Sequence, residues 1–192
     1  MKKHLLFLLL LMSVWMMTAC GGGRNRADSC RLTAKVEFPE FTQAYLTDGK
    51  GQVLDTLPLQ NGQIDFVCTD TSGMPYVAFV SLANPLDSLD RMDMPVVMEC
   101  GKVNVEIGEY IVTSGTPLNV RLQEFLNDLQ ATRDAIKEST VPTADVLKSF
   151  SEFYRQQILS NRDNVVGQFI FHHYGFHLNP EDAALVKVQL GN

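Results

Sequence analysis

The chain has 192 residues and a mass of 21.5 kDa, which is the size of one domain or of one domain with a small appendage. Its 45% hydrophobic and 20% charged residues are typical of a globular protein and exclude both a disordered chain and a polytopic membrane protein. Sixteen Lys and Arg against 22 Asp and Glu give a net charge of −6, which argues against nucleic-acid binding, because that function needs a basic face.

The N-terminus has the parts of a secretory signal peptide. Residues 1–4 are basic, residues 5–17 form a nearly unbroken apolar run, and small residues precede Cys20. A spanning helix needs roughly 20 apolar residues, so this shorter run indicates a signal peptide over residues 1–19. The site before Cys20 resembles the lipobox of bacterial lipoproteins, with Met17 where Leu is usual. The resemblance implies that Cys20 receives a diacylglyceryl group. The alternative is an ordinary secretory signal with a coincidental cysteine.

A lipid anchor determines where the protein lies in the cell. A Cys20 that carries a diacylglyceryl group and an N-acyl chain such as palmitate anchors stably to a membrane, because two acyl signals exceed the marginal binding of one chain. Residues 20–29 are rich in Gly and polar residues and predict a flexible tether. The tether lacks the acidic cluster that resembles a surface-export signal in Bacteroidota lipoproteins, which favours the outer membrane and a periplasm-facing position. Removal of residues 1–19 leaves 14 basic and 22 acidic residues, a net charge of −8.

Three cysteines remain once Cys20 is assigned to the lipid, namely Cys30, Cys68 and Cys100. An odd number in an oxidising compartment predicts one disulfide and one free thiol, and there is no Cys-x-x-Cys motif of the zinc-binding or thioredoxin type. If the strand that begins at Cys30 runs antiparallel to the strand over residues 63–69, Cys30 lies near Cys68. We therefore predict a Cys30–Cys68 disulfide with Cys100 as a free thiol. The alternative is three unpaired thiols.

The chain up to about residue 115 has the period of β-strands. Apolar and polar residues alternate from Leu32 to Phe38, which predicts a half-buried strand, and turn-forming pairs such as Asn61-Gly62 separate this run from others like it. Further strands are predicted at residues 44–47, 53–57, 63–69, 76–82, 95–100, 102–107 and 110–113. Residues 83–94 contain Asn84-Pro85 and four charged residues, and they predict a loop. About eight short strands at this spacing predict an antiparallel β-sandwich.

Helical periodicity begins near residue 116. Thr116-Pro117 places an N-cap residue before a proline at the first helical position, and Asn179-Pro180 repeats this arrangement before two acidic residues that suit the helix dipole. Helices are predicted from 116 through 136, from 143 to 161, from 163 or 164 to 175, and from 179 to about 190. Each has one apolar stripe that must be covered. The sequence therefore predicts an α+β, mainly β fold, with a sandwich over residues 30–115 and a helical appendage over residues 116–192.

Several segments resemble a known family in their order and spacing. They are residues 54–56, 61–66, 97–105 and 114–119. Together they are similar to an uncharacterised domain of Bacteroidota lipoproteins that often lies N-terminal to a thioredoxin-like or peroxiredoxin-like domain. The resemblance covers about residues 31–175, and Cys100 stands where Pro or Asn is more usual. The resemblance implies a periplasmic protein whose relatives often carry a redox domain. We expect this chain to lack the thioredoxin-like domain, so no catalytic residue is carried over.

Three of the four histidines are close in sequence, at His172, His173 and His177. One helical turn separates His173 from His177, a spacing that can bind a metal from one helix face. However, Gly175 lies between them, and neither a Cys nor a Glu-x-x-His arrangement completes a site. We therefore predict a packed helix end at these histidines and no metal or other cofactor.

Neither the acidic residues nor Cys100 predicts catalysis. The carboxylates of the predicted 83–94 loop do not have the spacing of a calcium-binding loop, so a solvated acidic loop is expected. They are Asp87, Asp90 and Asp93. Cys100 precedes Gly101 in a predicted hairpin, but no base can be placed beside it.

These observations predict a non-enzymatic binding or scaffolding module in the cell envelope. Its expected partners are the membrane, through the lipid anchor, and an envelope protein, with no nucleic acid among them. The alternative function is a periplasmic thiol-redox accessory related to thioredoxin-like proteins, because the resembling domains occur beside such proteins.

Overall fold

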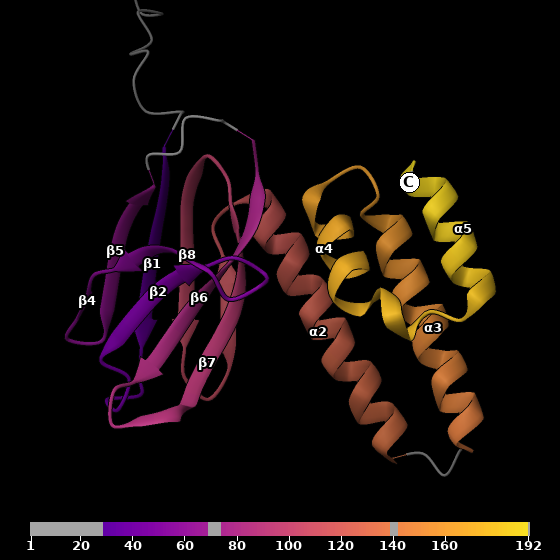
Figure 1. Ribbon diagram of the computed structural model, residues 1–192, viewed down its shortest axis with the longest axis horizontal. Coiled ribbons are helices and arrows are strands. Elements are labelled where there is room, and N and C mark those ends of the chain that lie inside the picture. Colours follow the sequence, from indigo (N-terminus) through magenta and orange to yellow (C-terminus); the bar gives the residue numbers. More distant parts are fainter. Residues whose placement is uncertain (1–28, 69–73, 139–141, 192) are drawn as a thin grey trace, which may run out of the picture.

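The computed structural model describes residues 29–68, 74–138 and 142–191, and in these ranges nine strands precede four α-helices (Figure 1). The strands form two sheets that pack face to face, and the helices lie beside them. The change from strands to helices falls between Ser114 and Pro117. The fold is α+β, which confirms the predicted class and the C-terminal position of the helices.

The first sheet has the strand order β4-β5-β1-β8-β9. In this sheet β1 lies in the middle, antiparallel to β5 and parallel to β8. The sequence predicts antiparallel strands only, so the parallel β1–β8 pair is a difference. It arises because the second sheet is formed by chain that lies between β1 and β8 in the sequence, after which the chain returns to the end of the first sheet where β1 begins. The five strands are β1 (Cys30–Val36), β4 (Leu59–Gln60), β5 (Gln63–Cys68), β8 (Gly101–Ile107) and β9 (Ile111–Ser114).

The second sheet has the order β3-β2-β6-β7, and its neighbouring strands are antiparallel. Its strands are β2 (Gln43–Thr47), β3 (Val53–Leu57), β6 (Tyr76–Asn84) and β7 (Asp87–Met98). Alternate residues of both sheets point inward and form the sandwich core, as expected for two packed sheets. Members of this core include Leu32, Val36, Ile64, Leu82, Val96 and Val105.

Residues 83–94 are not the loop that the sequence predicts. They belong to one long hairpin in which β6 pairs with β7 and Asn84 lies opposite Asp87. Along β7, Met94 faces the core while Arg91 and Asp93 are exposed, so the strand keeps its period of two. The prediction was wrong because the charged residues occupy the outer face of a real strand, and the proline lies in the tight turn.

The helices lie beside the sandwich and pack against β6 and β7 of the second sheet (Figure 1). They are α2 (Pro117–Glu138), α3 (Thr143–Ser160), α4 (Val165–Tyr174) and α5 (Pro180–Leu190), with a 3-10 turn at Gly175–His177. Val77, Phe79 and Val97 point from this sheet into a second core that the helices complete. The asparagines predicted at helix starts act as caps. Asn164 accepts from the Val166 amide and Asn179 from the Asp182 amide.

Helix α2 closes one side of the sandwich with two amide side chains. The buried Asn119 accepts the N–H of Val97 at 2.8 Å and donates to the carbonyl of the same residue at 2.7 Å. One turn later, Gln123 accepts the N–H of Thr113 at 2.6 Å and donates to the carbonyl of Ile111 at 3.4 Å. These backbone groups belong to β7 and β9, the edge strands of the two sheets. The helix therefore satisfies groups that open edges would leave unpaired.

Candidate functional site

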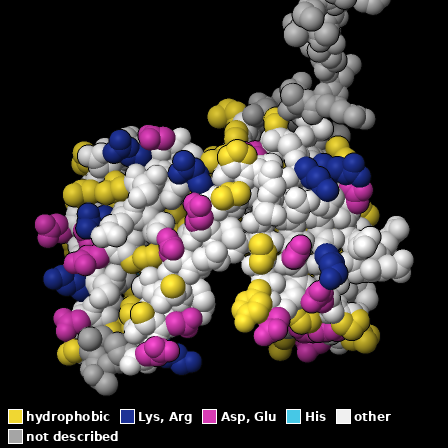
Figure 2. Space-filling view, turned by 180° about the vertical axis from the view of Figure 1, so that it is seen from behind, with side chains coloured by type: hydrophobic (Ala, Val, Ile, Leu, Met, Phe, Trp, Pro, Cys, Tyr) yellow, Lys and Arg dark blue, Asp and Glu magenta, His cyan; other side chains and the backbone are white. Residues whose placement is uncertain are grey.

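A groove of about 800 Å³ lies between α2 and the edge strands β7 and β9. The space-filling view from behind shows an open hollow between the sandwich and the helical part, with hydrophobic side chains on the sandwich side (Figure 2). The groove has an apolar floor, because Met94 and Leu129 are only 2% exposed. Tyr110 is 76% exposed and lies at its mouth with Val112. The groove therefore offers apolar surface to a molecule outside the domain.

Charged groups around this groove are mainly acidic. Glu109 comes from the β8–β9 turn and Asp134 from the last part of α2, and Arg133 lies beside them. A further carboxylate, Asp93, is paired with Arg91 at 3.0 Å. The rim consequently favours a ligand that carries positive charge.

Arg133 faces two phenols that line the inner part of the helical core. Burial raises the pKa of Tyr154, and the nearby charge of Arg133 acts in the opposite direction. Burial also raises the pKa of Tyr174, whose ring stacks on Tyr154 with the centroids 5.1 Å apart. Both phenols therefore stay protonated at neutral pH. They serve as hydrogen-bonding groups and not as bases.

The bonds from α2 to the strand edges limit how the groove can bind. Gln123 already occupies the Thr113 amide and the Ile111 carbonyl on the groove side of β9. Asn119 occupies both backbone groups of Val97 on β7. An incoming peptide cannot add a strand at these positions. The groove is therefore arranged for contacts with side chains.

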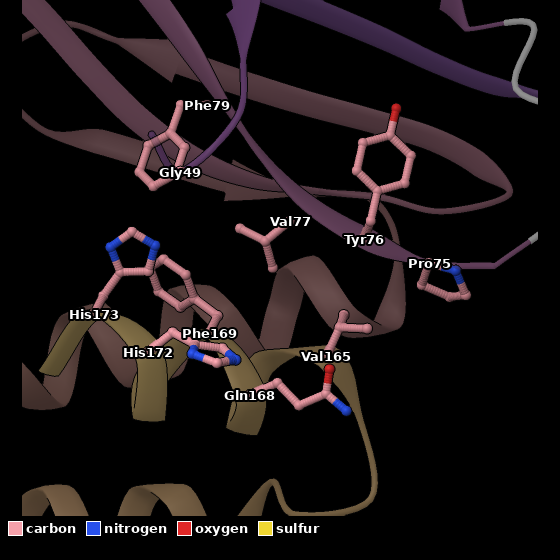
Figure 3. A pocket seen from close by; sticks show the side chains of 10 residues that line it. All are labelled: Gly49, Pro75, Tyr76, Val77, Phe79, Val165, Gln168, Phe169, His172 and His173. Carbon is pink, nitrogen blue, oxygen red and sulfur yellow. The ribbon is translucent and has the colours of Figure 1, made fainter. Parts of the chain in front are cut away.

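Two of the predicted histidines line a smaller pocket of about 260 Å³ between β6 and α4 (Figure 3). His173 lies beside Phe79 and Phe169, with ring centroids 5.4 and 4.7 Å away. His172 and Gln168 face the pocket from α4, whereas Tyr76 points the other way, into the sandwich. Burial, and then the neighbouring His172, lower the pKa of His173. The His173 ring is thus a neutral part of an aromatic cluster.

His177 lies apart from this pocket. Its ring stacks on Tyr154 with the centroids 5.2 Å apart and lies tilted beside Phe176 with the centroids 4.0 Å apart. Burial lowers the pKa of His177. In the part of the chain that the structure describes, no three His, Cys, Asp or Glu side chains are grouped so that they could hold a metal ion. The structure therefore separates His177 from the His172–His173 pair.

The three cysteines lie at one end of the first sheet. Cys30 begins β1, Cys68 ends β5 directly opposite it, and Cys100 precedes β8 in the turn from β7. Cys30 is buried and Cys100 is exposed. The hydroxyl of Tyr76 lies 3.7 Å from the sulfur of Cys68. The predicted proximity of Cys30 and Cys68 is confirmed by the strand register, whereas the disulfide itself stays a prediction.

The three acidic residues of the 83–94 segment bind neighbours within the β6–β7 hairpin. Asp90 accepts from the side-chain amide of Asn84 at 2.9 Å, and Asp87 accepts from the backbone of Leu89 at the same distance. Asp93 accepts from Ser81 and is paired with Arg91, as described above. These carboxylates organise the hairpin and do not converge on one point.

No motif or helix cap in the sequence predicts the groove residues as a site. One signal is the run Tyr110-Ile111-Val112, which places three apolar residues in succession at a short edge strand. A half-exposed strand normally has polar residues at alternate positions. All three are at least 36% exposed. The position of Arg133 beside Tyr154 had no such signal, because it depends on how α2 and α3 pack.

Neither a protein-family model nor a curated protein matches this sequence. The likeness to the Bacteroidota lipoprotein domain therefore remains a prediction.

Proposed function

We propose that this chain is a lipid-anchored envelope protein that binds a partner protein in the groove between α2, β7 and β9 without catalysing a reaction. The observation that carries the proposal is the exposed apolar surface at the mouth of this groove, where Tyr110 is 76% exposed. Exposed aromatic residues next to a formed apolar cavity are typical of binding surfaces. The partner surface that fits is an apolar side chain flanked by Lys or Arg, because Glu109 and Asp134 lie at the rim.

A role without catalysis is supported by what the polar groups in the groove already do. Gln123 bonds the backbone of β9 and also donates to Asn127 at 2.9 Å. Gln130 donates to both carboxylate oxygens of Asp134 at 3.0 Å. The two buried phenols stay protonated because burial raises their pKa values. These groups shape and orient the groove, and they leave its apolar surface as the main source of affinity.

The lipid anchor is the second part of the proposal. Cys20 and the signal peptide lie outside the described residues, and the support for them is the sequence pattern. Among the described helices, none has both the length and the apolar character needed to span a bilayer. A Cys20→Ser variant is expected to lose incorporation of labelled palmitate and to leave the membrane fraction. Unchanged labelling and fractionation would contradict the anchor.

Site-specific photo-crosslinking tests the groove. A benzoylphenylalanine is introduced at Tyr110 and, as a matched control, at Val188 of α5, which has the same exposed fraction of 76%. We expect a crosslinked product in cell envelopes for Tyr110 and none for Val188, and sequencing of the crosslinked peptide should show apolar residues beside Lys or Arg. Reversal of the rim charge by Glu109→Lys with Asp134→Lys should reduce the yield. Equal crosslinking at both positions would refute the proposal, and so would a crosslinking yield that the charge reversal leaves unchanged.

A second candidate function, a thiol-redox accessory of the periplasm, is supported by one observation. Cys30, Cys68 and Cys100 come from three separate parts of the chain and gather at the same end of the first sheet. Trapping of thiols in intact cells tests this role. A disulfide pattern that never changes between reducing and oxidising growth conditions would exclude it.

A further inference from the structure

The strand order places Cys30 between the other two cysteines. β1 is flanked by β5 on one side and β8 on the other. Cys30 lies opposite Cys68 in the antiparallel register, and both side chains point to the sandwich core, where Cys68 packs against the buried cluster. Directly opposed residues of an antiparallel pair have Cα atoms about 4.5–5.5 Å apart, which is within the range of disulfide bonds. Cys30 and Cys68 can therefore be joined without moving either strand.

Cys100 approaches Cys30 from the other side. In the parallel register Cys30 lies opposite Gly101, the residue that follows Cys100. The amide of Gly101 donates to the carbonyl of Ser29 at 3.2 Å, so the turn that carries Cys100 is bonded to the start of β1. The backbone of Glu99 acts against burial and lowers the pKa of the Cys30 thiol, so this part of the turn lies close to the buried sulfur. Cys100 is therefore next to the buried thiol, while its own side chain is exposed.

Cys68 and Cys100 are kept apart by β1 itself. They lie on opposite sides of this strand, and two strand spacings amount to about 9–10 Å. Residues whose Cα atoms are more than about 7 Å apart cannot form a disulfide without backbone movement. Of the three pairings that three cysteines allow, the strand order argues against Cys68–Cys100, and the two that remain both use Cys30.

We propose that Cys30 is the shared sulfur of two mutually exclusive disulfides, Cys30–Cys68 and Cys30–Cys100, and that the exposed Cys100 exchanges one for the other. The proposal gives a site to the thiol-redox role above. It rests on the strand order of the first sheet and is independent of what the groove binds.

The chemistry balances in two steps. In the first, the thiols of Cys30 and Cys68 give up two protons and two electrons to a disulfide oxidant, which becomes two thiols. In the second, the Cys100 thiolate attacks the sulfur of Cys30. The Cys30–Cys100 bond forms, the Cys30–Cys68 bond breaks, and Cys68 leaves as a thiolate that takes a proton from water. The exchange step consumes no oxidant.

The surroundings of the two sulfurs give the exchange its direction. A thiol with a lower pKa leaves faster, and burial raises the pKa of Cys30 to about 11, so Cys30 is a poor leaving group. The sulfur of Cys68 is 3.7 Å from the hydroxyl of Tyr76, which can donate to the departing thiolate. Attack at Cys30 with release of Cys68 is therefore favoured over attack at Cys68 with release of Cys30. An external thiol can reach the exposed Cys100 more readily than the buried Cys30.

Disulfide mapping tests this inference on the full chain purified from membranes in detergent. The protein is equilibrated with reduced and oxidised glutathione, quenched with acid, alkylated and digested with trypsin, which places each of the three cysteines on its own peptide. In the wild type we expect Cys30 linked to Cys68 and to Cys100, in proportions that change with the glutathione ratio. No Cys68–Cys100 link is expected.

Three variants separate the pairings. Cys100→Ser should retain only Cys30–Cys68, and Cys68→Ser should retain only Cys30–Cys100. Cys30→Ser should lose both bonds and leave the remaining two thiols alkylated. Circular dichroism confirms folding, and the wild-type map gives the answer if a variant misfolds. A Cys68–Cys100 bond in any folded sample, a pair that includes Cys20, or a wild type with Cys30–Cys68 alone at every glutathione ratio would overturn the proposal.

Discussion

Replacement of Asn119 tests whether α2 stabilises the sandwich through its edge strands. The side chain is fully buried and satisfies both backbone groups of Val97, with a third bond to the Thr116 hydroxyl at 2.8 Å. A buried polar group that loses its partner destabilises a protein by about 1–3 kcal/mol, so two orphaned groups predict a loss of about 4 kcal/mol for Asn119→Ala. This is a large share of the roughly 5–15 kcal/mol by which domains are stable.

Urea unfolding followed by far-UV circular dichroism measures this loss. The control is Gln130→Ala on the same helix, whose side chain is exposed and should change stability by no more than about 0.5 kcal/mol. Gln123→Ala should fall between the two, near about 1 kcal/mol, because water can reach its partly exposed site. An Asn119→Ala loss within about 1 kcal/mol of the control would refute the reasoning. Asn119→Asp should recover part of its stability at low pH, where the protonated acid can again donate to the Val97 carbonyl.

Two further substitutions test the histidine pocket and a turn. Burial lowers the pKa of His173 below 6.5, so the unfolded chain binds more protons and stability is lost as pH falls below about 6.5. His173→Gln should reduce the drop in Tm between about pH 7.5 and pH 5.5, and a drop equal to that of the wild type would contradict this. Gly115 has φ +101°, and an added Cβ would lie 2.2 Å from the carbonyl oxygen of Lys102. In denaturant unfolding, Gly115→Ala should therefore lower the free energy of unfolding by more than about 2 kcal/mol. Gly51 has φ +81° and open space around it, so Gly51→Ala should lower it by about 1 kcal/mol. Equal losses for the two variants would argue against the clash.

Most elements of the fold could be predicted from periodicity and end signals. The strand at Cys30–Val36 and the helices that begin after Thr116 and at Pro180 follow the alternation and cap residues seen in the sequence. The exceptions were the two-residue Leu59–Gln60 strand and the Asp87–Met98 strand, and in the latter charges on the outer face hid the alternation of the inner one. Single-sequence patterns describe burial on one face well, and they fail where a strand is long, exposed and rich in charge.

The sites were less predictable than the fold. The approach of Cys30 to Cys68 followed from one antiparallel register, which the sequence could suggest. The place of Cys100 beside Cys30 depends on a parallel pair between strands far apart in the chain, and no local pattern encodes it. Likewise, Asn119 and Gln123 are ordinary helix residues until packing brings them to the edges of β7 and β9.

The central position of β1 also sets the order in which this domain can assemble. Thr33 on β1 hydrogen-bonds Val103 on β8, a residue 70 positions later in the chain. Contacts of such long sequence separation slow folding, because loop closure must precede any gain from pairing. A chain that is synthesised N-terminus first thus presents β1 long before β8, which lies beside it in the sheet, is available. We expect refolding on a millisecond-to-second timescale and a period in which β1 lacks one of its two neighbours.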